Sequence, residues 1–269
     1  MNNNTFVSIH PEAVIGKNAT IHPFVNIDKG VIIGDNCEIR SFVSIQEGTT
    51  IGNDNKIFEG CVIGALPQEF SKENKRENKV IIGHGNTIRE NVVINRSIDP
   101  DHATSIGNKN FLMEGVHLAH DVVVGNECVL AFNSKITPNC EIDDFAYIGA
   151  ATVINKYCKV GKWSFISAGS VVYKHVPPYV RIGGNPIEWK GINTTILLKN
   201  NFTESAIKQI LFAYRLIYGN YTLFYALEKV KKQSVGRDET NEIIHFMEQV
   251  KDKGIAGKEE TEKKDEKDK

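Results

Sequence analysis

The sequence lacks both a long hydrophobic run and an excess of charge of one sign. Lysine and arginine together number 32 and aspartate and glutamate 33, which gives a formal net charge of −1. This balance does not favour a nucleic-acid-binding protein. No stretch approaches the roughly 18 apolar residues of a membrane span, and the start "MNNNTFVSIH" has neither the basic nor the apolar region of a signal peptide. We therefore expect a cytoplasmic globular protein of one or two domains.

A repeat of six residues organises most of the chain. Isoleucine occupies every sixth position from Ile9 to Ile63. The pattern restarts at Ile82 and continues through aliphatic residues to Val172, with an interruption at Pro100. Neither an α-helix nor a flat strand has this period. It is the hexapeptide pattern of a parallel β-helix, and at three hexads per coil it predicts about eight stacked coils.

Cysteine is scarce, and its placement follows the same repeat. There are five cysteines, an odd number that argues against a closed disulfide framework, and their spacing fits no metal motif. Each stands four positions after a repeat aliphatic, where a compact inward side chain is required. We predict that all five fill the core: Cys37, Cys61, Cys128, Cys140 and Cys158.

Two segments leave the repeat and are candidates for binding, because excursions from a rigid solenoid often carry functional groups. Residues 65–80 are polar and charged, and residues 96–105 contain the interrupting proline. The repeat is expected to end at "HVPPYVRIGGNP", whose adjacent prolines cannot donate to a ladder. We assign residues 1–190, with both excursions, to a β-helix domain.

Helical patterns follow the repeat. The string "FTESAIKQILFAYRLIYGNYT" predicts a helix with Thr203 as its N-cap and Gly219 as its C-cap. The strings "TLFYALEKVKKQ" and "DETNEIIHFMEQVKDKG" predict two more helices, so we assign residues 191–254 to a small α-helical domain. Residues 255–269 form a mixed-charge run without apolar anchors, which predicts a disordered tail.

The string "FLMEGVHLAHDVVVGNECVL", residues 111–130, contains the candidate catalytic residues. Leu118 is a repeat aliphatic that faces inward, so His117 and the pair His120-Asp121 are expected at the outer surface or at a corner. A carboxylate beside an imidazole can fix its tautomer and stabilise its charged form, as general-base catalysis requires. A solvated surface edge is the alternative interpretation.

Residues one coil apart are expected to stand above one another. Moving from His120 in steps of one coil reaches Pro138, then Lys156, then Lys174. Two cations on the edge that carries the imidazole could meet an anionic ligand.

Several strings together resemble the UDP-N-acetylglucosamine O-acyltransferases of lipid A synthesis. They are "PQEF" in the first excursion, "LMEGVHLAHDVVVGNECVL", "IDDFAYIGAATV" and the exit "HVPPYV...GNP", followed by the helical segment. The resemblance covers roughly residues 8–225 and implies a left-handed β-helix that assembles as a homotrimer with active sites between subunits. It also implies that His120 is the catalytic base, Asp121 its partner and His117 a further histidine of the cleft.

The chain departs from that family at several positions of the implied site. Where the family has Gly-His, this chain has Pro138-Asn139, and a proline has no N–H to donate to an oxyanion. Where the family has a histidine followed by glutamine, this chain has Asn155-Lys156. Ala168 matches a glycine that leaves room for a long acyl chain, which indicates a shorter acyl group here.

These departures favour a related group in the same superfamily, the N-acetyltransferases that act on nucleotide-linked 3-amino-3,6-dideoxyhexoses. An amine is a stronger nucleophile than a hydroxyl and needs fewer supporting groups. We therefore expect an acyltransferase that moves an acetyl group from acetyl-coenzyme A to the amino group of a nucleotide-linked amino sugar. The alternative is O-acylation of UDP-N-acetylglucosamine from a hydroxyacyl carrier protein.

This hypothesis assigns binding residues around the catalytic pair. The residues expected to bind the sugar nucleotide are His117, Gln68, Glu69, Asn95, Arg96 and Asn139. Those expected to contact coenzyme A are Asn155, Lys156, Ala168 and Lys174. No metal is expected, although His102, His117 and His120 leave a zinc site as a further alternative, and a scaffold without catalysis is another.

Overall fold

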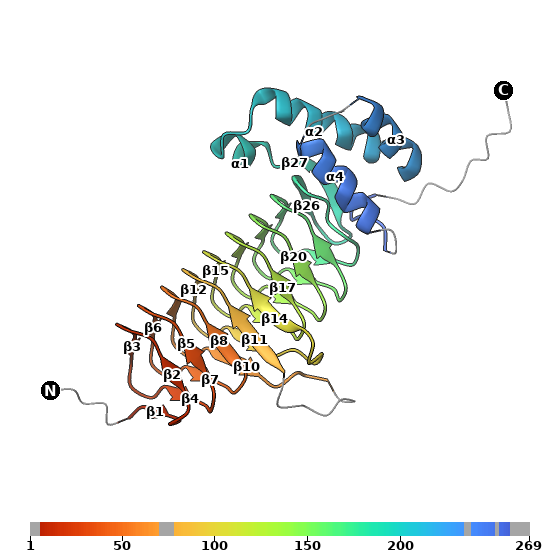
Figure 1. Cartoon of the computed structure of the whole chain (residues 1–269). Helices are drawn as coiled ribbons and strands as arrows, with labels where there is room; N and C mark the ends of the chain where they lie inside the picture. Colours follow the sequence, from red (N-terminus) through yellow and green to blue (C-terminus); the bar gives the residue numbers. More distant parts are fainter. Residues whose placement is uncertain (1–5, 70–77, 234–237, 251–252, 259–269) are drawn as a thin grey trace, which may run out of the picture.

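The computed structural model shows a three-sided column of short strands with a cluster of helices at one end (Figure 1). The structure describes residues 6–69, 78–233, 238–250 and 253–258. Part of the first predicted excursion, residues 70–77, and most of the predicted tail, residues 259–269, lie outside them. None of the helices in the described ranges has both the length and the apolar character that a membrane crossing requires.

Three sheets form the sides of the column, and every strand in them except β27 pairs in parallel. Sheet A contains β1 (Ser8–Ile9), β4 (Asn26–Ile27), β7 (Ser44–Ile45), β10 (Val62–Ala65), β13 (Val93–Asn95), β16 (His117–Leu118), β19 (Lys135–Ile136), β22 (Val153–Ile154) and β25 (Val171–Val172). Sheet B contains β2 (Val14–Ile15), β5 (Ile32–Ile33), β8 (Thr49–Ile51), β11 (Lys79–Ile82), β14 (Ala103–Ile106), β17 (Val123–Val124), β20 (Glu141–Ile142) and β23 (Lys159–Val160). Sheet C contains β3 (Thr20–Ile21), β6 (Glu38–Ile39), β9 (Lys56–Ile57), β12 (Thr87–Ile88), β15 (Phe111–Leu112), β18 (Val129–Leu130), β21 (Tyr147–Ile148), β24 (Phe165–Ile166), β26 (Val180–Gly183) and β27 (Glu188–Ile192).

The register of the strands confirms the repeat that the sequence predicts. Leu118 of β16 pairs with Ile94 below it and with Ile136 above it, and all three side chains are fully buried. Each such side chain contributes roughly 1.5–3 kcal/mol of hydrophobic stabilisation when it is fully buried. Three consecutive strands close one coil, so the strands from β1 to β24 make eight coils. The predicted left-handed parallel β-helix with a helical C-terminal region is confirmed.

The cysteines also lie where the repeat places them. All five are buried and none forms a disulfide. Burial raises the pKa of the thiol to about 12 at Cys61, Cys128 and Cys140. A thiol with such a pKa is inert at neutral pH, which is the property of a core side chain.

The column ends with two strands that lie in and just after the string "HVPPYVRIGGNP". After the turn that contains Pro177 and Pro178, β26 adds one more parallel strand to sheet C, and β27 then pairs with β26 in the antiparallel sense. The prolines do not interrupt a ladder, because they precede β26 and no ladder donor is required of them. The strand β26 thus lies within the string at which the repeat was expected to end, and residue 190, the expected boundary, falls within β27.

Four helices follow in the part of the chain that the structure describes, one more than the three predicted. They are α1 (Thr194–Lys199), α2 (Glu204–Ile217), α3 (Leu223–Gln233) and α4 (Asp238–Gln249). The hydroxyl of Thr203 accepts from the Ala206 N–H at 3.1 Å, which confirms the predicted N-cap of α2. The C-cap is Tyr218, so the helix ends one residue before Gly219, which was the predicted C-cap. Helix α1 was missed because it is short and Asn193 before it makes no side-chain cap bond.

The first residues of the predicted disordered tail are ordered. Ile255 forms a parallel bridge with His175, and the Ala256 N–H donates to the His175 carbonyl at 2.8 Å. Both Ile255 and Ala256 are buried. The prediction was wrong for residues 255–258 because Ile255 and Ala256 provide the apolar anchor that the charged run after them lacks.

Both excursions leave the column at the edge between sheets A and B, which we call the A/B edge. The first connects β10 of sheet A to β11 of sheet B, and the second connects β13 of sheet A to β14 of sheet B. In the next coil, the residues between β16 and β17 turn at this same edge. The fold therefore brings both excursions beside His120, where their side chains can enclose a binding site.

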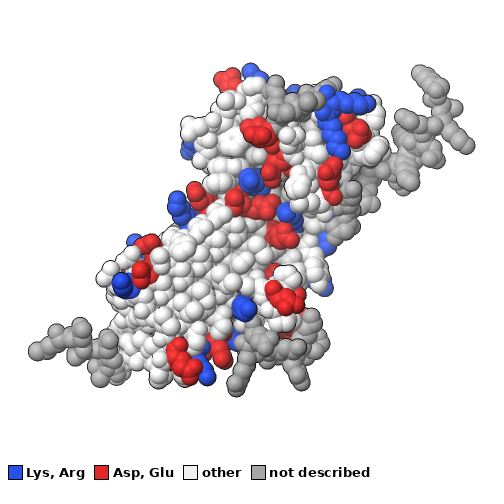
Figure 2. All heavy atoms as spheres, in the orientation of Figure 1, with Lys and Arg blue, Asp and Glu red and all other residues white. Residues whose placement is uncertain are grey.

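One side of the column is nearly free of charge. Figure 2 shows that the centre of the visible face, on which β11, β14 and β17 lie, carries few charged side chains. The outward residues Val14, Ile32, Ile81 and Val123 of sheet B are between 42% and 58% exposed.

Candidate active site

His120 is positioned by the corner that follows β16. In that strand Leu118 faces the core and His117 faces outward, beside Val93 below and Lys135 above. The chain then turns into sheet B through His120 and Asp121, and Asp121 takes the left-handed conformation with φ of 60°. Non-glycine residues adopt this conformation infrequently, with aspartate among the more tolerant ones. The turn places both side chains at the A/B edge.

The carboxylate of Asp121 holds the imidazole of His120. The His120 Nδ1 atom lies 2.7 Å from Oδ2 of Asp121. Both carboxylate oxygens also accept from the Ile98 N–H, each at 3.2 Å, and the Asp121 N–H donates to Oγ1 of Thr104 at 2.8 Å. Because the second excursion thus fixes the carboxylate, Nδ1 is assigned as the protonated nitrogen and Nε2 as the free base.

The Nε2 atom of His120 is buried without a hydrogen-bond partner among the described residues. The histidine is only 7% exposed. On the Nε2 side of the ring lies the carboxylate of Glu69, whose Oε2 atom is 3.8 Å from Nε2. Beside the ring lies a cleft of about 300 Å³. It is lined by Gln68, Asn95, His117, Ala119, His120, Lys135, Ile136, Thr137 and Pro138. A buried lone pair that faces a cleft is suited to take a proton from a bound group.

His117 shares this cleft but has a different electrostatic environment. Burial, and secondarily the charge of Lys135, lower the pKa of His117 below its ordinary value. The ring is therefore neutral at pH 7 and can both donate and accept a hydrogen bond. The structure brings His117, Gln68 and Glu69 together with His120, as the sequence predicted.

Two other predicted substrate-binding residues support the first excursion instead. The Asn95 amide donates to the Leu66 carbonyl at 2.7 Å, although part of Asn95 also lines the cleft. The Arg96 guanidinium is buried and donates to the Gly64 carbonyl at 2.9 Å. Burial lowers the pKa of Arg96. Their hydrogen bonds hold the start of the excursion that carries Gln68 and Glu69.

The other predicted residues are spread along the column. Asn139 lies one coil above Asp121 and lines a separate groove. Its N–H donates to the His120 carbonyl at 3.3 Å. Asn155, Lys156 and Lys174 follow at higher coils of the A/B edge.

Ala168 lies between β24 of sheet C and β25 of sheet A, at a different corner of the column. Within one chain, the structure therefore does not bring it together with the other residues assigned to the donor.

Sequence reasoning missed four residues that line the cleft, namely Ala119, Lys135, Ile136 and Thr137. Lys135 stands one coil above His117 and projects from the same face of sheet A. Counting one coil onward from His117, as was done from His120 to Pro138, would have identified Lys135 from the sequence.

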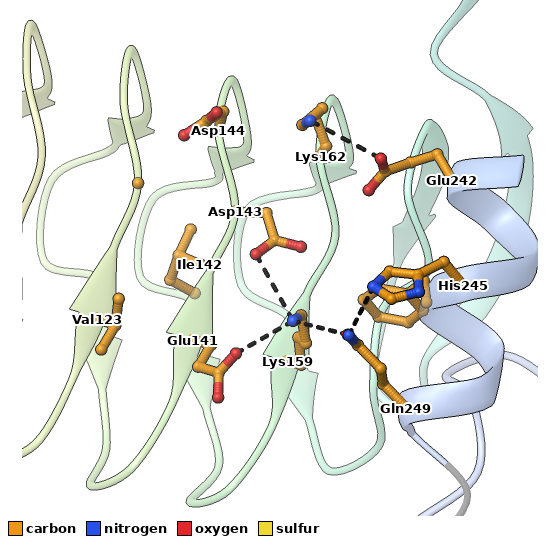
Figure 3. A pocket seen from close by; sticks show the side chains of 12 residues that line it. Val123, Glu141, Ile142, Asp143, Asp144, Lys159, Lys162, Glu242, His245 and Gln249 are labelled. Atoms are coloured by element: carbon orange, nitrogen blue, oxygen red, sulfur yellow. Dashed lines mark hydrogen bonds and ion pairs between the residues drawn. The ribbon is translucent and has the colours of Figure 1, made fainter. Parts of the chain in front are cut away.

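A second groove lies between sheet B and α4 (Figure 3). Lys159 reaches the carboxylates of Glu141 at 3.1 Å and Asp143 at 3.9 Å, and it donates to Gln249 of α4 at 3.2 Å. Burial raises the pKa of Asp143 to about 6, although the charge of Lys159 opposes this change. These contacts connect the helical end to the column.

The histidines considered for zinc do not converge. His102 lies on the second excursion, where its Nδ1 atom is 2.8 Å from Asp99, and its side chain is 74% exposed. Across the described ranges, no cluster of three or more His, Cys, Asp or Glu side chains has the geometry to hold a metal ion.

Comparison with protein families finds two matches. The family described as UDP N-acetylglucosamine O-acyltransferase, domain 2, matches residues 175–256. The bacterial transferase hexapeptide family matches residues 12–47, 30–65 and 103–138.

The similar curated proteins are named for the same activity. The acyl-[acyl-carrier-protein]–UDP-N-acetylglucosamine O-acyltransferase of Verminephrobacter eiseniae is 39% identical over 218 residues, which are 78% of this chain and 83% of that protein. The protein of the same name from Burkholderia ambifaria is 40% identical over 181 residues, 67% of this chain and 68% of its own length.

Solved structures agree with these relatives. The UDP-N-acetylglucosamine acyltransferase LpxA of Bacteroides fragilis superposes with a TM-score of 0.89 at 40% identity and covers 93% of this chain and 98% of its own. LpxA of Acinetobacter baumannii gives a TM-score of 0.89 at 30% identity, with 94% and 98% covered.

These comparisons contradict the expected N-acetyltransfer from acetyl-coenzyme A. The relatives are named as O-acyltransferases with an acyl carrier protein as donor, which corresponds to the alternative reading. The error came from treating the exchanges at Pro138 and Asn155 as a change of substrate class, although His120 and Asp121, which the resemblance implies to be catalytic, are both present. The assignment of Asn155, Lys156, Ala168 and Lys174 to coenzyme A falls with that donor.

The matching family models, the relatives and the superposed structures point to the same kind of protein. The chain is an acyltransferase of the left-handed β-helical type, and it belongs to the family of UDP-N-acetylglucosamine O-acyltransferases.

Proposed function

We propose that this protein transfers an acyl group from an acyl carrier protein to a hydroxyl group of UDP-N-acetylglucosamine. The observation that carries the proposal is the buried His120 ring, with Nδ1 held by Asp121 at 2.7 Å and Nε2 without a partner beside a cleft. The names of the relatives supply the donor and the acceptor.

In the proposed reaction, the acceptor hydroxyl gives its proton to Nε2 of His120 as its oxygen attacks the thioester carbonyl. Asp121 stabilises the imidazolium that forms and keeps the ring in position. The imidazolium then returns the proton to the thiolate that leaves. A positioned general base contributes typically 100-fold to 10,000-fold to the rate.

We also propose that Gln68, Glu69 and His117 bind the sugar. All three lie at or near the cleft, and Glu69 reaches within 3.8 Å of Nε2. A carboxylate accepts hydrogen bonds from sugar hydroxyl groups and can therefore hold the acceptor next to the base.

The proposed assembly is a homotrimer, in which a neighbouring subunit closes the cleft. The weakly charged surface of sheet B adjoins the A/B edge, and an exposed apolar surface of this kind marks an interaction site.

The test is an assay with purified protein, UDP-N-acetylglucosamine and acyl carrier proteins that carry acyl chains of different length. We expect a product whose mass corresponds to an ester of the nucleotide sugar. A parallel reaction with acetyl-coenzyme A as donor serves as the comparison. His102→Ala is a matched control variant, because this exposed histidine lies outside the cleft. Product from acetyl-coenzyme A and none from any acyl carrier protein would overturn the proposal.

A further inference from the structure

Pro138 cannot supply a backbone donor for the oxyanion of acyl transfer in this cleft. When a hydroxyl attacks a thioester, negative charge develops on the carbonyl oxygen, and a preorganised N–H group or cation stabilises it. Pro138 lines the cleft at the coil above His120, and its ring nitrogen has no hydrogen. The backbone at this position therefore cannot supply the donor.

Two polar side chains of the cleft already donate to backbone carbonyls. The Asn95 amide donates to Leu66 at 2.7 Å and to Ala65 at 3.4 Å. The Thr137 hydroxyl donates its one hydrogen to the Ile154 carbonyl at 2.8 Å. Turning the Asn95 amide toward a substrate would leave the Leu66 carbonyl without this donor. Turning the Thr137 hydroxyl would remove one of the two donors of the Ile154 carbonyl, which also accepts from the Thr137 N–H at 3.1 Å. Each change gives up a hydrogen bond and has a cost in free energy.

Lys135 is different, because its charge is not neutralised. It projects outward from β19 beside His117, and it is the one lysine or arginine among the described residues that line the cleft. Its Nζ atom donates to the Gly115 carbonyl at 2.7 Å, and no described carboxylate lies within ion-pair distance of it. The ammonium group therefore keeps two N–H donors and its full positive charge.

The field of this ammonium group already acts within the cleft. Lys135 is the one charged group that contributes to the lowered pKa of His117, after burial. Because His117 and His120 line the same cleft, the charge of Lys135 lies close to the place where the reaction would occur.

We propose that Lys135 stabilises the oxyanion of acyl transfer and replaces the backbone donor that Pro138 removes. The role rests on the proposed function. The acceptor oxygen forms a bond to the thioester carbon while its proton moves to Nε2 of His120. The carbonyl electron pair moves to oxygen, beside the Lys135 ammonium group. When the pair returns, the carbon–sulfur bond breaks and the carrier thiolate takes the proton from His120.

The test compares Lys135→Met, which keeps length without charge, with Lys135→Arg, which keeps charge. Lys56→Met is the matched control, because Lys56 also projects from a strand but belongs to sheet C. Single-turnover acyl transfer and the steady-state kcat and KM for UDP-N-acetylglucosamine are measured for all four proteins.

We expect Lys135→Met to lower the single-turnover rate and kcat about 100-fold or more, as loss of an oxyanion donor does. The KM for the nucleotide sugar should change less than about threefold, Lys135→Arg should recover part of the rate, and Lys56→Met should match the wild type. A rate within about threefold of the wild type for Lys135→Met would overturn the proposal. So would an effect confined to KM, which would mean that Lys135 binds the diphosphate of the substrate.

The proposed function and the proposed role of Lys135 can be tested separately. If the wild type does not acylate UDP-N-acetylglucosamine, hydrolysis of the acyl thioester by water still forms the same oxyanion. The Lys135→Met variant should then hydrolyse the thioester more slowly than the wild type, by the same factor as expected for acyl transfer. A wild type without transfer and without hydrolysis would overturn both proposals.

Discussion

Replacing Asp143 by asparagine is expected to stabilise the protein at neutral pH and to have little effect in acid. Asp143 lies in the groove between sheet B and α4, where Lys159 is 3.9 Å away (Figure 3). Burial raises the pKa of its carboxyl from the ordinary 3.8 to about 6, and the charges of Glu141 and Glu242 add to this effect. Lys159 and Lys162 oppose it without reversing it. Keeping Asp143 ionised at neutral pH therefore lowers the stability of the folded protein.

The size of the effect follows from the two pKa values. A difference of one pH unit corresponds to about 1.4 kcal/mol, so the difference between 3.8 and about 6 corresponds to about 3 kcal/mol. Because the folded pKa is the higher one, the folded state binds the proton more tightly than the unfolded state. Stability is fully retained below pH 3.8 and is lost as the pH rises through about 6. Asparagine has no charge to bury, so its advantage should grow over the same interval.

The assay is the thermal midpoint of wild type and Asp143→Asn, measured from pH 4 to pH 8. We expect the midpoints to be close at pH 4 and the variant to be more stable at pH 8. Glu141→Gln is the control in the same groove. Its carboxylate is 56% exposed, and an exposed ion pair contributes about 0–1 kcal/mol, so the control should change little at any pH. A variant that is less stable than the wild type at pH 8, or a difference that does not depend on pH, would refute the reasoning.

Three further predictions concern the rest of the molecule. Thr203→Ala should destabilise α2 by about 1 kcal/mol, measured by urea denaturation, because the N-cap acceptor for the Ala206 N–H is lost; Thr203→Ser should retain most of it, and equal loss in both would contradict the cap. A thiol reagent such as Ellman's reagent should find no reactive cysteine in the folded protein and all five after unfolding, because the thiols are buried; rapid labelling of the native protein would show that the core assignment is wrong. Sedimentation should give three times the chain mass of 30.0 kDa, with Val123→Asp on the exposed surface of sheet B shifting it toward one copy; a wild-type monomer would contradict the proposed trimer.

The regular part of the fold could be predicted from the sequence because its physical rule is local and repeated. One large aliphatic per hexad fixes which residue faces inward, and Leu118 between Ile94 and Ile136 shows that the register follows from counting alone. The same counting placed His120 at an edge and the cysteines in the core. Helix α2 was also accessible, because Thr203 and the apolar spacing after it are local signals.

The parts that could not be predicted depend on contacts between distant segments. The burial of Ile255 comes from its pairing with His175, and nothing near residue 255 in the sequence indicates it. The support of Asp121 by the Ile98 N–H depends on the course of the second excursion. The position of Lys135 beside His117 was accessible, but its lack of a carboxylate partner among the described residues required coordinates.

The substrate class was predicted incorrectly for a different reason. Pro138 and Asn155 differ from the residues of the resembled family, and each difference was interpreted as the loss of a substrate contact. The residues that the resemblance implies to be catalytic, His120 and Asp121, were unchanged and have a geometry that suits a base and its support. A catalytic pair therefore carries more information about reaction type than the absence of individual binding groups, whose place another side chain can take.

The most direct test of the account is the single-turnover rate of acyl transfer from acyl carrier protein to UDP-N-acetylglucosamine by the wild type and by His120→Ala. If Nε2 of His120 removes the proton of the attacking hydroxyl, the variant should be slower by about 100-fold to 10,000-fold. Wild-type and variant proteins that form the ester at the same rate would contradict the account.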